Sequence, residues 1–325
     1  MKLALGVAPL ALLIAITTAA GRAEEGTPEQ LVDALNAIFG KHGARASHAR
    51  GVCVRGEFVP AANAKDLSKA APFAQTVPVL GRFSMGGGKP NIPDATKSAP
   101  RGFALRLGEA DGPHTDLVMI SAPVFFASTA AQMLGFLEAR APSADGKPDQ
   151  EKIKAFAAAN PNTTKQGAWL SSHPIPASYA GVNYWAVHAY KLTDGEGQAT
   201  TVKFKLTPSG GEAGLTDEEG KGKPADFYKA DLEARLAKAP IELSLVAIVG
   251  EASDPTDDPT VMWPEEKRQS TTLGTVSVKS LAEDSVCDAT IFDPLSLAEG
   301  IAGPDRDPIF AVRSPAYAIS LSRRQ

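Results

Sequence analysis

The feature that most constrains the fold is a series of eight short apolar segments, rich in Val, Phe and Leu and separated by turn residues. They fall into two groups of four, with helical patterns between the groups. The segments span residues 48–59, 77–85, 102–107, 115–120, 183–192, 200–206, 240–249 and 273–279. Short strands that do not alternate with helices are typical of antiparallel sheets. We therefore predict an α+β fold built on an eight-stranded antiparallel barrel or sandwich with flanking helices.

Helical patterns flank and separate the strand-like segments. Residues 27–39 begin with Thr27, Pro28 and Gln30, which supply an N-cap, a favourable first helical residue and a capping box. Further helices are expected at 129–140, 150–160 and 226–238. Between two strands, the turn-rich segment at 193–197 is expected to form a hairpin turn.

The N-terminus has the pattern of a secretory signal peptide. Lys2 precedes an apolar run from Leu3 to Ile16, and small residues follow as far as Ala23. The run is shorter than the roughly 20 residues of a membrane-spanning helix. We predict that residues 1–23 are a signal peptide, that 24–325 form a single domain, and that the mature protein is periplasmic.

The net charge of the chain and the absence of several motifs exclude some classes of function. The formal net charge of −4 argues against a nucleic-acid binder, which needs a basic patch to displace counterions. The sequence has no P-loop, no G-x-S-x-G elbow and no H-E-x-x-H motif. We therefore expect small-molecule partners, no nucleic acid and no membrane span.

The two cysteines, Cys53 and Cys287, leave two alternatives open. In an oxidising compartment they would be able to form a disulfide, but sequence position does not show whether their Cα atoms approach closely enough. Isolated cysteines also serve as small buried apolar residues. Two cysteines are too few for a metal cluster.

Two places in the sequence carry unusual polar groups. In RASHARG, His48 lies between Arg45 and Arg50 on a strand-like segment. In the C-terminal RSPAYAISLSRRQ, a helix would place Arg313 and Tyr317 on one face, four residues apart. A guanidinium beside a phenol stabilises the phenolate. Taken alone, each place also fits an ordinary solvated surface.

Taken together and in order, seven segments resemble the haem catalase family. They are RASHARG, VPVLGRFS, APRGFALRL, TDLVMISAPVFF, MWP, IFDP and RSPAY. The series covers nearly the whole chain after residue 23 and is most similar to the short exported branch, the catalase-related peroxidases. The resemblance implies the catalase-type barrel and haem b (iron protoporphyrin IX). Because the chain stops soon after Tyr317, we expect it to lack the C-terminal helical domain of larger catalases, and to be a monomer or small homo-oligomer.

The resemblance also implies roles for individual residues. His48 corresponds to the distal base above the haem, Tyr317 to the proximal ligand of the iron, and Arg313 to the arginine that holds the Tyr317 phenolate. Ser84 matches the serine that steadies the distal histidine. Phe125 matches the aromatic residue that packs beside that histidine over the haem.

Further matches concern the haem edge and the proximal side. Three arginines would bind the two haem propionates, since each carboxylate accepts paired N–H donors. These arginines are Arg45, Arg82 and Arg324. On the proximal side, His188 and Asp307 would extend the tyrosine–arginine hydrogen-bond relay. Arg50 keeps its ordinary interpretation as a surface or structural charge.

The chain also departs from the family pattern. Ile120 stands where monofunctional catalases have an asparagine that orients peroxide, and isoleucine has no hydrogen-bond donor. Ser47, before the distal histidine, occupies a position that is often Val. We expect weak oxygen release and stronger one-electron oxidation of an organic donor. The alternative is that a shifted loop presents another donor, such as Ser121.

The function predicted from these residues is a haem peroxidase that reduces hydrogen peroxide or organic hydroperoxides with an organic electron donor. Neutral His48 would transfer a proton between the two peroxide oxygens. One alternative is a fatty-acid hydroperoxide lyase or isomerase on the same fold. Another is a haem-binding protein without turnover, since fold resemblance alone does not establish activity.

Overall fold

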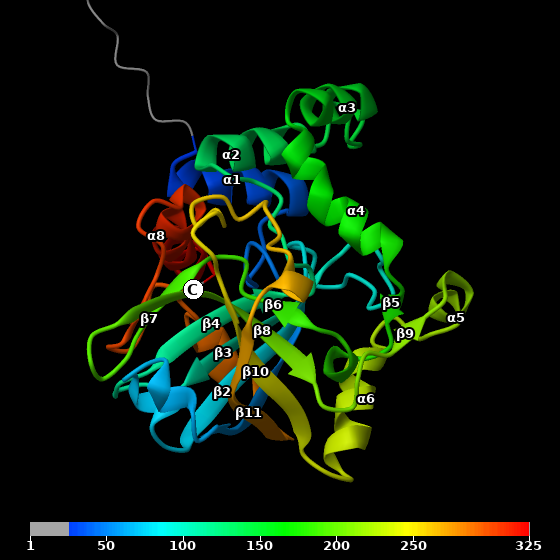
Figure 1. Cartoon of the computed structure of the whole chain (residues 1–325). Helices are drawn as coiled ribbons and strands as arrows, with labels where there is room; N and C mark the ends of the chain where they lie inside the picture. Colours follow the sequence, from blue (N-terminus) through cyan, green and yellow to red (C-terminus); the bar gives the residue numbers. More distant parts are fainter. Residues whose placement is uncertain (1–25, 325) are drawn as a thin grey trace, which may run out of the picture.

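A computed structural model describes residues 26–324, so the predicted signal peptide lies outside the described residues (Figure 1). Eight strands form a closed antiparallel barrel in the order β10-β11-β1-β2-β3-β4-β6-β8, and pairing of β8 with β10 closes it. The barrel strands are β1 (Gly51–Pro60), β2 (Val77–Met85), β3 (Arg101–Leu107), β4 (Thr115–Ile120), β6 (Tyr184–Trp185), β8 (Ala199–Pro208), β10 (Ile241–Val249) and β11 (Ser270–Leu281). The predicted eight-stranded barrel is therefore confirmed.

Four further strands lie outside the closed barrel. β7 (Tyr190–Thr193) pairs with β8, and β12 (Ile301–Ala302) extends the same sheet by pairing with β7. A separate two-stranded sheet joins β5 (Ile175–Pro176) to β9 (Gly214–Leu215). The turn between β7 and β8 is the expected hairpin at 193–197, in which the Asp194 N–H donates to the Gln198 carbonyl.

The helices lie outside the barrel. They are α1 (Pro28–Phe39), α2 (Ala130–Glu138), α3 (Gln150–Ala159), α4 (Lys165–Ser172), α5 (Asp217–Lys221), α6 (Phe227–Leu236), α7 (Asp284–Ala289) and α8 (Pro308–Ser322). The capping box predicted at Thr27 and Gln30 is present at the start of α1. Figure 1 shows α1, α2 and α8 together at one end of the barrel, where they share an apolar cluster around Leu31 and Leu134. No helix within 26–324 is both long and apolar enough to cross a bilayer.

Alternate strand residues fill the barrel interior. Phe83 and Phe103 are fully buried, and their rings stack with centroids 4.0 Å apart. Because successive side chains of a strand point to opposite faces, Arg82 and Ser84 lie on the outer face beside Phe83. Ser84 is directly opposite Gly102 on β3, so this outer face continues across the sheet. The polar side chains of Arg82 and Ser84 therefore lie on the outer face of the barrel and not in its interior.

Two of the predicted strand boundaries are wrong in an informative way. The strand predicted from residue 48 begins at Gly51, and His48 precedes it with a φ of 53°, in the left-handed region. The single strand predicted over 183–192 is divided into β6 and β7. Between them the backbone leaves the ladder, and His188 contacts Asp307 instead of extending a regular strand.

Candidate active site

The proximal group is a relay of four side chains on and beside α8. Asp307 caps α8 by accepting N–H bonds from its first turn, and its other carboxylate oxygen lies 2.6 Å from His188 Nδ1. His188 Nε2 lies 2.9 Å from Arg313 Nη1. Arg313 then donates to the Tyr317 hydroxyl through Nε at 3.0 Å and through Nη2 at 2.6 Å. The i, i+4 spacing expected from the sequence thus brings this guanidinium onto the phenol.

The protonation state of His188 fits this relay. Burial lowers the pKa of His188 to about 4, against the opposing effect of the Asp307 hydrogen bond, and Arg313 lowers it further. A neutral ring that donates from Nδ1 to Asp307 has its lone pair on Nε2, which faces a donor of Arg313. Arg313 is thereby held in place against the Tyr317 oxygen.

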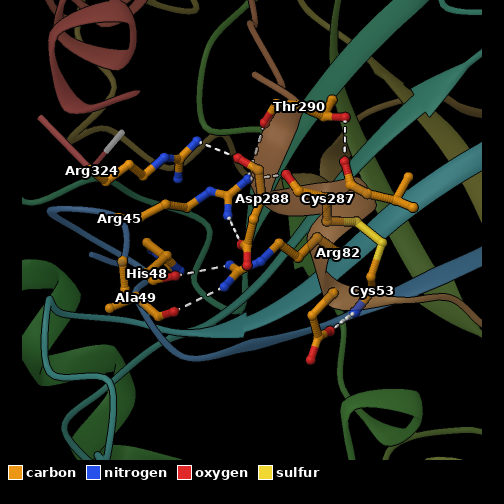
Figure 2. A network of polar contacts seen from close by, with 12 residues as sticks. Arg45, His48, Ala49, Cys53, Arg82, Cys287, Asp288, Thr290 and Arg324 are labelled. Atoms are coloured by element: carbon orange, nitrogen blue, oxygen red, sulfur yellow. Dashed lines mark hydrogen bonds and ion pairs between the residues drawn. A yellow bond between two sulfur atoms is a disulfide. The ribbon is translucent and has the colours of Figure 1, made fainter. Parts of the chain in front are cut away.

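The distal group is built on the segment that precedes β1. Ser84 Oγ lies 2.9 Å from His48 Nδ1. Arg82 donates from Nη1 to the His48 carbonyl at 2.8 Å and from Nη2 to the Ala49 carbonyl at 3.0 Å (Figure 2). These two bonds hold the left-handed backbone of His48, a conformation with a cost for a non-glycine residue. The ring therefore projects from a turn that precedes β1 and not from the strand itself.

A glycine makes room for the distal histidine. A Cβ atom added at Gly102 would lie 2.5 Å from Ser84 Oγ and 2.7 Å from His48 Nδ1. Burial lowers the pKa of His48 to about 4, and the charges of Arg82, Arg313 and Arg45 lower it further. The ring is therefore neutral near pH 7. The tautomer that donates from Nδ1 to Ser84 leaves Nε2 able to accept a proton.

Ile120 belongs to the same outer face as the distal group. It is directly opposite Gly102, which in turn is opposite Ser84. Residues opposite each other on antiparallel strands point to the same face, so Ile120 lies on the side of the sheet where His48 is held. The side chain at this position is half-buried and offers no hydrogen bond.

Ser121 lies in a different environment from the distal histidine. Its hydroxyl accepts the Arg101 N–H at 2.9 Å, and its side chain is buried. It lines a cavity of about 400 Å³ together with Trp169 and Trp185, and His48 is not part of that lining. The alternative in which Ser121 serves the distal histidine is not supported by this geometry.

Three arginines gather beside the distal segment and α7, and we name them the arginine clamp: Arg45, Arg82 and Arg324 (Figure 2). Arg45 Nη1 donates to Asp288 Oδ1 at 2.8 Å, and Arg324 Nη2 donates to the Asp288 carbonyl at 2.9 Å. Burial, then the charge of Arg45, lowers the pKa of both Arg82 and Arg324 to about 10. Like charges this close favour an anionic ligand.

The clamp has unused hydrogen-bonding capacity. Arg324 Nε is buried, and no partner for it exists within residues 26–324. A buried donor without a partner has a free-energy cost of about 1–3 kcal/mol, which a carboxylate would remove. The clamp, the Tyr317 phenol and the neutral His48 thus fit a ferric porphyrin with two propionates, since a hard anionic oxygen suits ferric iron.

The two cysteines are paired, which resolves the alternative left open by the sequence. Cys53 on β1 and Cys287 on α7 form a disulfide with their Cα atoms 5.7 Å apart, and both residues are fully buried. Their separation of 234 residues gives no local signal for the pairing. The backbone carbonyl of Cys287 also accepts a hydrogen bond from Arg45 Nη2 at 2.6 Å.

The remaining predicted residues lie as follows. Phe125 packs against Phe126 with ring centroids 4.3 Å apart, and no aromatic contact joins it to His48 in the described part of the chain. Arg50 forms an ion pair with buried Asp94 at 3.3 Å, as expected for a structural charge. Ser47 is half-buried beside the distal histidine. The roles assigned to all these residues stay predictions.

Sequence reasoning missed Asp288 and Gly102. Asp288 is one of many acidic residues, and only the fold brings it to Arg45, 243 residues away in the chain. Gly102 follows Arg101 at the start of β3 and is marked by no turn. The register opposite Ser84 was the signal that would have shown its importance, and it is known only once β2 and β3 are paired.

Comparisons with known proteins agree with this geometry. Residues 41–324 match the family model for catalases. A catalase-related peroxidase of Synechococcus elongatus is 35% identical and covers 99% of this chain and 96% of its own. A catalase-related peroxidase of Mycolicibacterium paratuberculosis is 32% identical, covering 92% and 95% respectively.

Solved structures show the same fold. Catalase A of Saccharomyces cerevisiae superimposes with a TM-score of 0.77 at 21% identity, covering 86% of this chain and 61% of its own. A fungal catalase gives the same TM-score at 22% identity, with 59% of its own chain covered. The chain therefore spans about three fifths of these longer catalases. By its family match and its full-length relatives, the chain belongs to the catalase family, in the branch of the catalase-related peroxidases.

Proposed function

We propose that the protein is a haem peroxidase that reduces hydrogen peroxide or an organic hydroperoxide at the expense of an organic electron donor, and that it releases little oxygen. One observation carries the proposal. A neutral His48 and an arginine-bound Tyr317 phenol come from two segments in direct contact, because the Ala46 N–H, two residues before His48, donates to Ser320 Oγ on α8 at 3.2 Å. Two full-length relatives named catalase-related peroxidases support it.

Each group would have one task. Tyr317 would hold the iron, with Arg313 keeping the ligand oxygen negatively charged, and the arginine clamp would bind the propionates. When bound, haem b would supply the iron that binds peroxide and takes up its oxidising equivalents.

His48 would carry the proton. Its Nε2 would accept the proton from one oxygen of hydrogen peroxide and return it to the other, which then leaves as water and not as hydroxide. Ser84 would hold the ring in the tautomer that this transfer requires. Ile120 would leave a second peroxide poorly oriented, because nothing at that position donates a hydrogen bond. An organic donor, oxidised one electron at a time, needs no such orientation.

The site does not favour the other two hypotheses. A haem carrier has no use for a neutral distal base, yet His48 is held in a strained backbone conformation that carries a cost. The relatives described above give no support to a hydroperoxide lyase or isomerase. We also propose export to the periplasm, which the buried Cys53–Cys287 disulfide supports because such bonds persist in oxidising compartments.

The test compares two activities in one preparation. Haem-loaded protein is given hydrogen peroxide with and without a dye donor, and dye oxidation and oxygen release are recorded together. Dye turnover that exceeds oxygen release is expected. Vigorous oxygen release with little dye oxidation would contradict the assignment as a peroxidase. In a separate sample with a fatty-acid hydroperoxide, consumption without any donor would favour the lyase or isomerase.

A further inference from the structure

The short helix α7 holds two of the three arginines of the clamp. Arg45 donates to three oxygens supplied by α7 and the residue after it, namely the Asp288 carboxylate at 2.8 Å, the Cys287 carbonyl at 2.6 Å and the Thr290 carbonyl at 3.0 Å. Arg324 donates to the Asp288 carbonyl (Figure 2). The position of α7 therefore decides where these two guanidinium groups lie.

α7 has little stability of its own. It has six residues, and isolated helices shorter than about 12 residues are marginal in water. Its N-cap residue, Glu283, makes no side-chain capping bond. The arginines it holds also repel one another. Its position must therefore be fixed by contacts with the rest of the protein.

The Cys53–Cys287 disulfide connects α7 covalently to β1 of the barrel. Around it, Asp284 Oδ1 accepts the Cys53 N–H at 3.0 Å, and the Ala282 N–H donates to the Cys53 carbonyl at 2.9 Å. The disulfide lies in a small apolar cluster with Phe292, separate from the barrel interior. On the barrel side, Cys53 is directly opposite Arg82, the third arginine of the clamp.

We propose that the Cys53–Cys287 disulfide is a positioning element for the arginine clamp, which fixes α7 against β1 so that the guanidinium groups of Arg45 and Arg324 are in place before the haem carboxylates bind. The proposal rests on the proposed function in that haem is the ligand. A site arranged in advance binds more tightly, because less ordering is required on binding. The disulfide touches no substrate and acts chiefly through Arg45, which donates three hydrogen bonds to α7 and Thr290, whereas Arg324 donates one.

A double-mutant cycle tests the proposal with haem affinity as the readout. The full chain without haem is titrated with ferric protoporphyrin IX and followed by absorbance, in the parent and in Cys53→Ala/Cys287→Ala, each with and without Arg45→Ala. Loss of the disulfide should weaken haem binding roughly tenfold in the parent and less than about twofold once Arg45 is gone, because residues that act through one another are not additive.

Arg323→Ala is a matched control, because it removes an arginine next to Arg324 in the sequence that is not part of the clamp. Arg323 pairs with Asp33 on α1 at 2.7 Å, away from the clamp. In this background the loss of the disulfide should keep its full effect on haem affinity. An equal effect in the Arg45→Ala background, or no effect in the parent, would overturn the proposal.

Two further measurements distinguish misfolding of a variant from failure of the proposal. Thermal unfolding establishes that each variant is folded at the titration temperature. If the double cysteine variant is not folded, Asp284→Ala takes its place, because it keeps the disulfide but removes the bond to the Cys53 N–H. This variant should show a smaller loss of haem affinity, and that loss should also disappear with Arg45→Ala. Additive losses of haem affinity would overturn the proposal. A parent that binds no haem would overturn the proposed function as well, whereas an additive cycle in an active peroxidase would overturn this inference alone.

Discussion

Replacing Ile120 with asparagine should raise oxygen release. Ile120 is opposite Gly102, at which an added Cβ would lie 2.7 Å from His48 Nδ1. Opposite Cβ atoms on antiparallel strands are about 4.5–5.5 Å apart, so an amide at position 120 reaches the space beside His48. One neutral hydrogen bond contributes about 0.5–1.5 kcal/mol, which corresponds to a rate increase of roughly two- to tenfold.

The assay measures oxygen release with an electrode and dye oxidation by absorbance, on protein of equal haem content. Ile120→Val is the matched control, because it changes the shape of the side chain without adding a donor. The asparagine variant should gain oxygen release relative to the valine variant, with dye oxidation little changed. Burying an amide at this half-buried position is expected to lower the free energy of unfolding by about 1–3 kcal/mol. Equal oxygen release from both variants would refute the reasoning about Ile120.

Three other predictions concern the two histidines and their neighbours. His48→Ala should lower peroxide consumption by about 10²-fold or more while haem affinity stays the same, and an unchanged rate would remove the distal base from the account. Gly102→Ala should lower peroxide consumption with unchanged haem content, because its Cβ would displace His48 or Ser84; full activity would show that the pocket has spare room. The free energy of unfolding should fall as pH drops from about 6.5 toward 4, because burial lowers the pKa of His188 to about 4 and the unfolded chain binds the proton first. Denaturant titrations across this range, with His188→Gln as the variant that lacks this contribution, test the direction.

Much of the barrel follows from local patterns. The positions of β2 and β4 agree with the apolar runs at 77–85 and 115–120, because turn residues interrupt the chain on both sides of each strand. The start of α1 was predicted from the capping box at Thr27, which is a local hydrogen-bond pattern. Features with a local cause are therefore visible in the sequence.

Features that depend on contacts between residues far apart in the sequence cannot be predicted from local patterns. His48 adopts a left-handed backbone because Arg82, on another strand, binds two carbonyls of the segment. The strand predicted over 183–192 is interrupted because His188 forms its bond with Asp307, 119 residues away. The disulfide joins residues 234 positions apart. In each case the partner is known only once the barrel has closed.

The candidate site was found from the order of the family-like segments along the chain more than from the residue composition of any one segment. Single features, such as a histidine between arginines, fit an ordinary surface equally well. The family resemblance connected the segment around His48 with the C-terminal helix, and the structure brings both to one place. Asp288 remained hidden, because its contact with Arg45 depends on where α7 lies against the barrel.

The central claim is that this chain binds haem through Tyr317, and one measurement tests it most directly. The absorption spectrum of purified, haem-titrated protein is compared with that of Tyr317→Phe, which keeps the ring but removes the ligand oxygen. We expect one haem per chain with the spectrum of tyrosinate-ligated ferric iron, and the loss of that spectrum in the variant. A parent that takes up no haem, or a variant whose spectrum is unchanged, would contradict it.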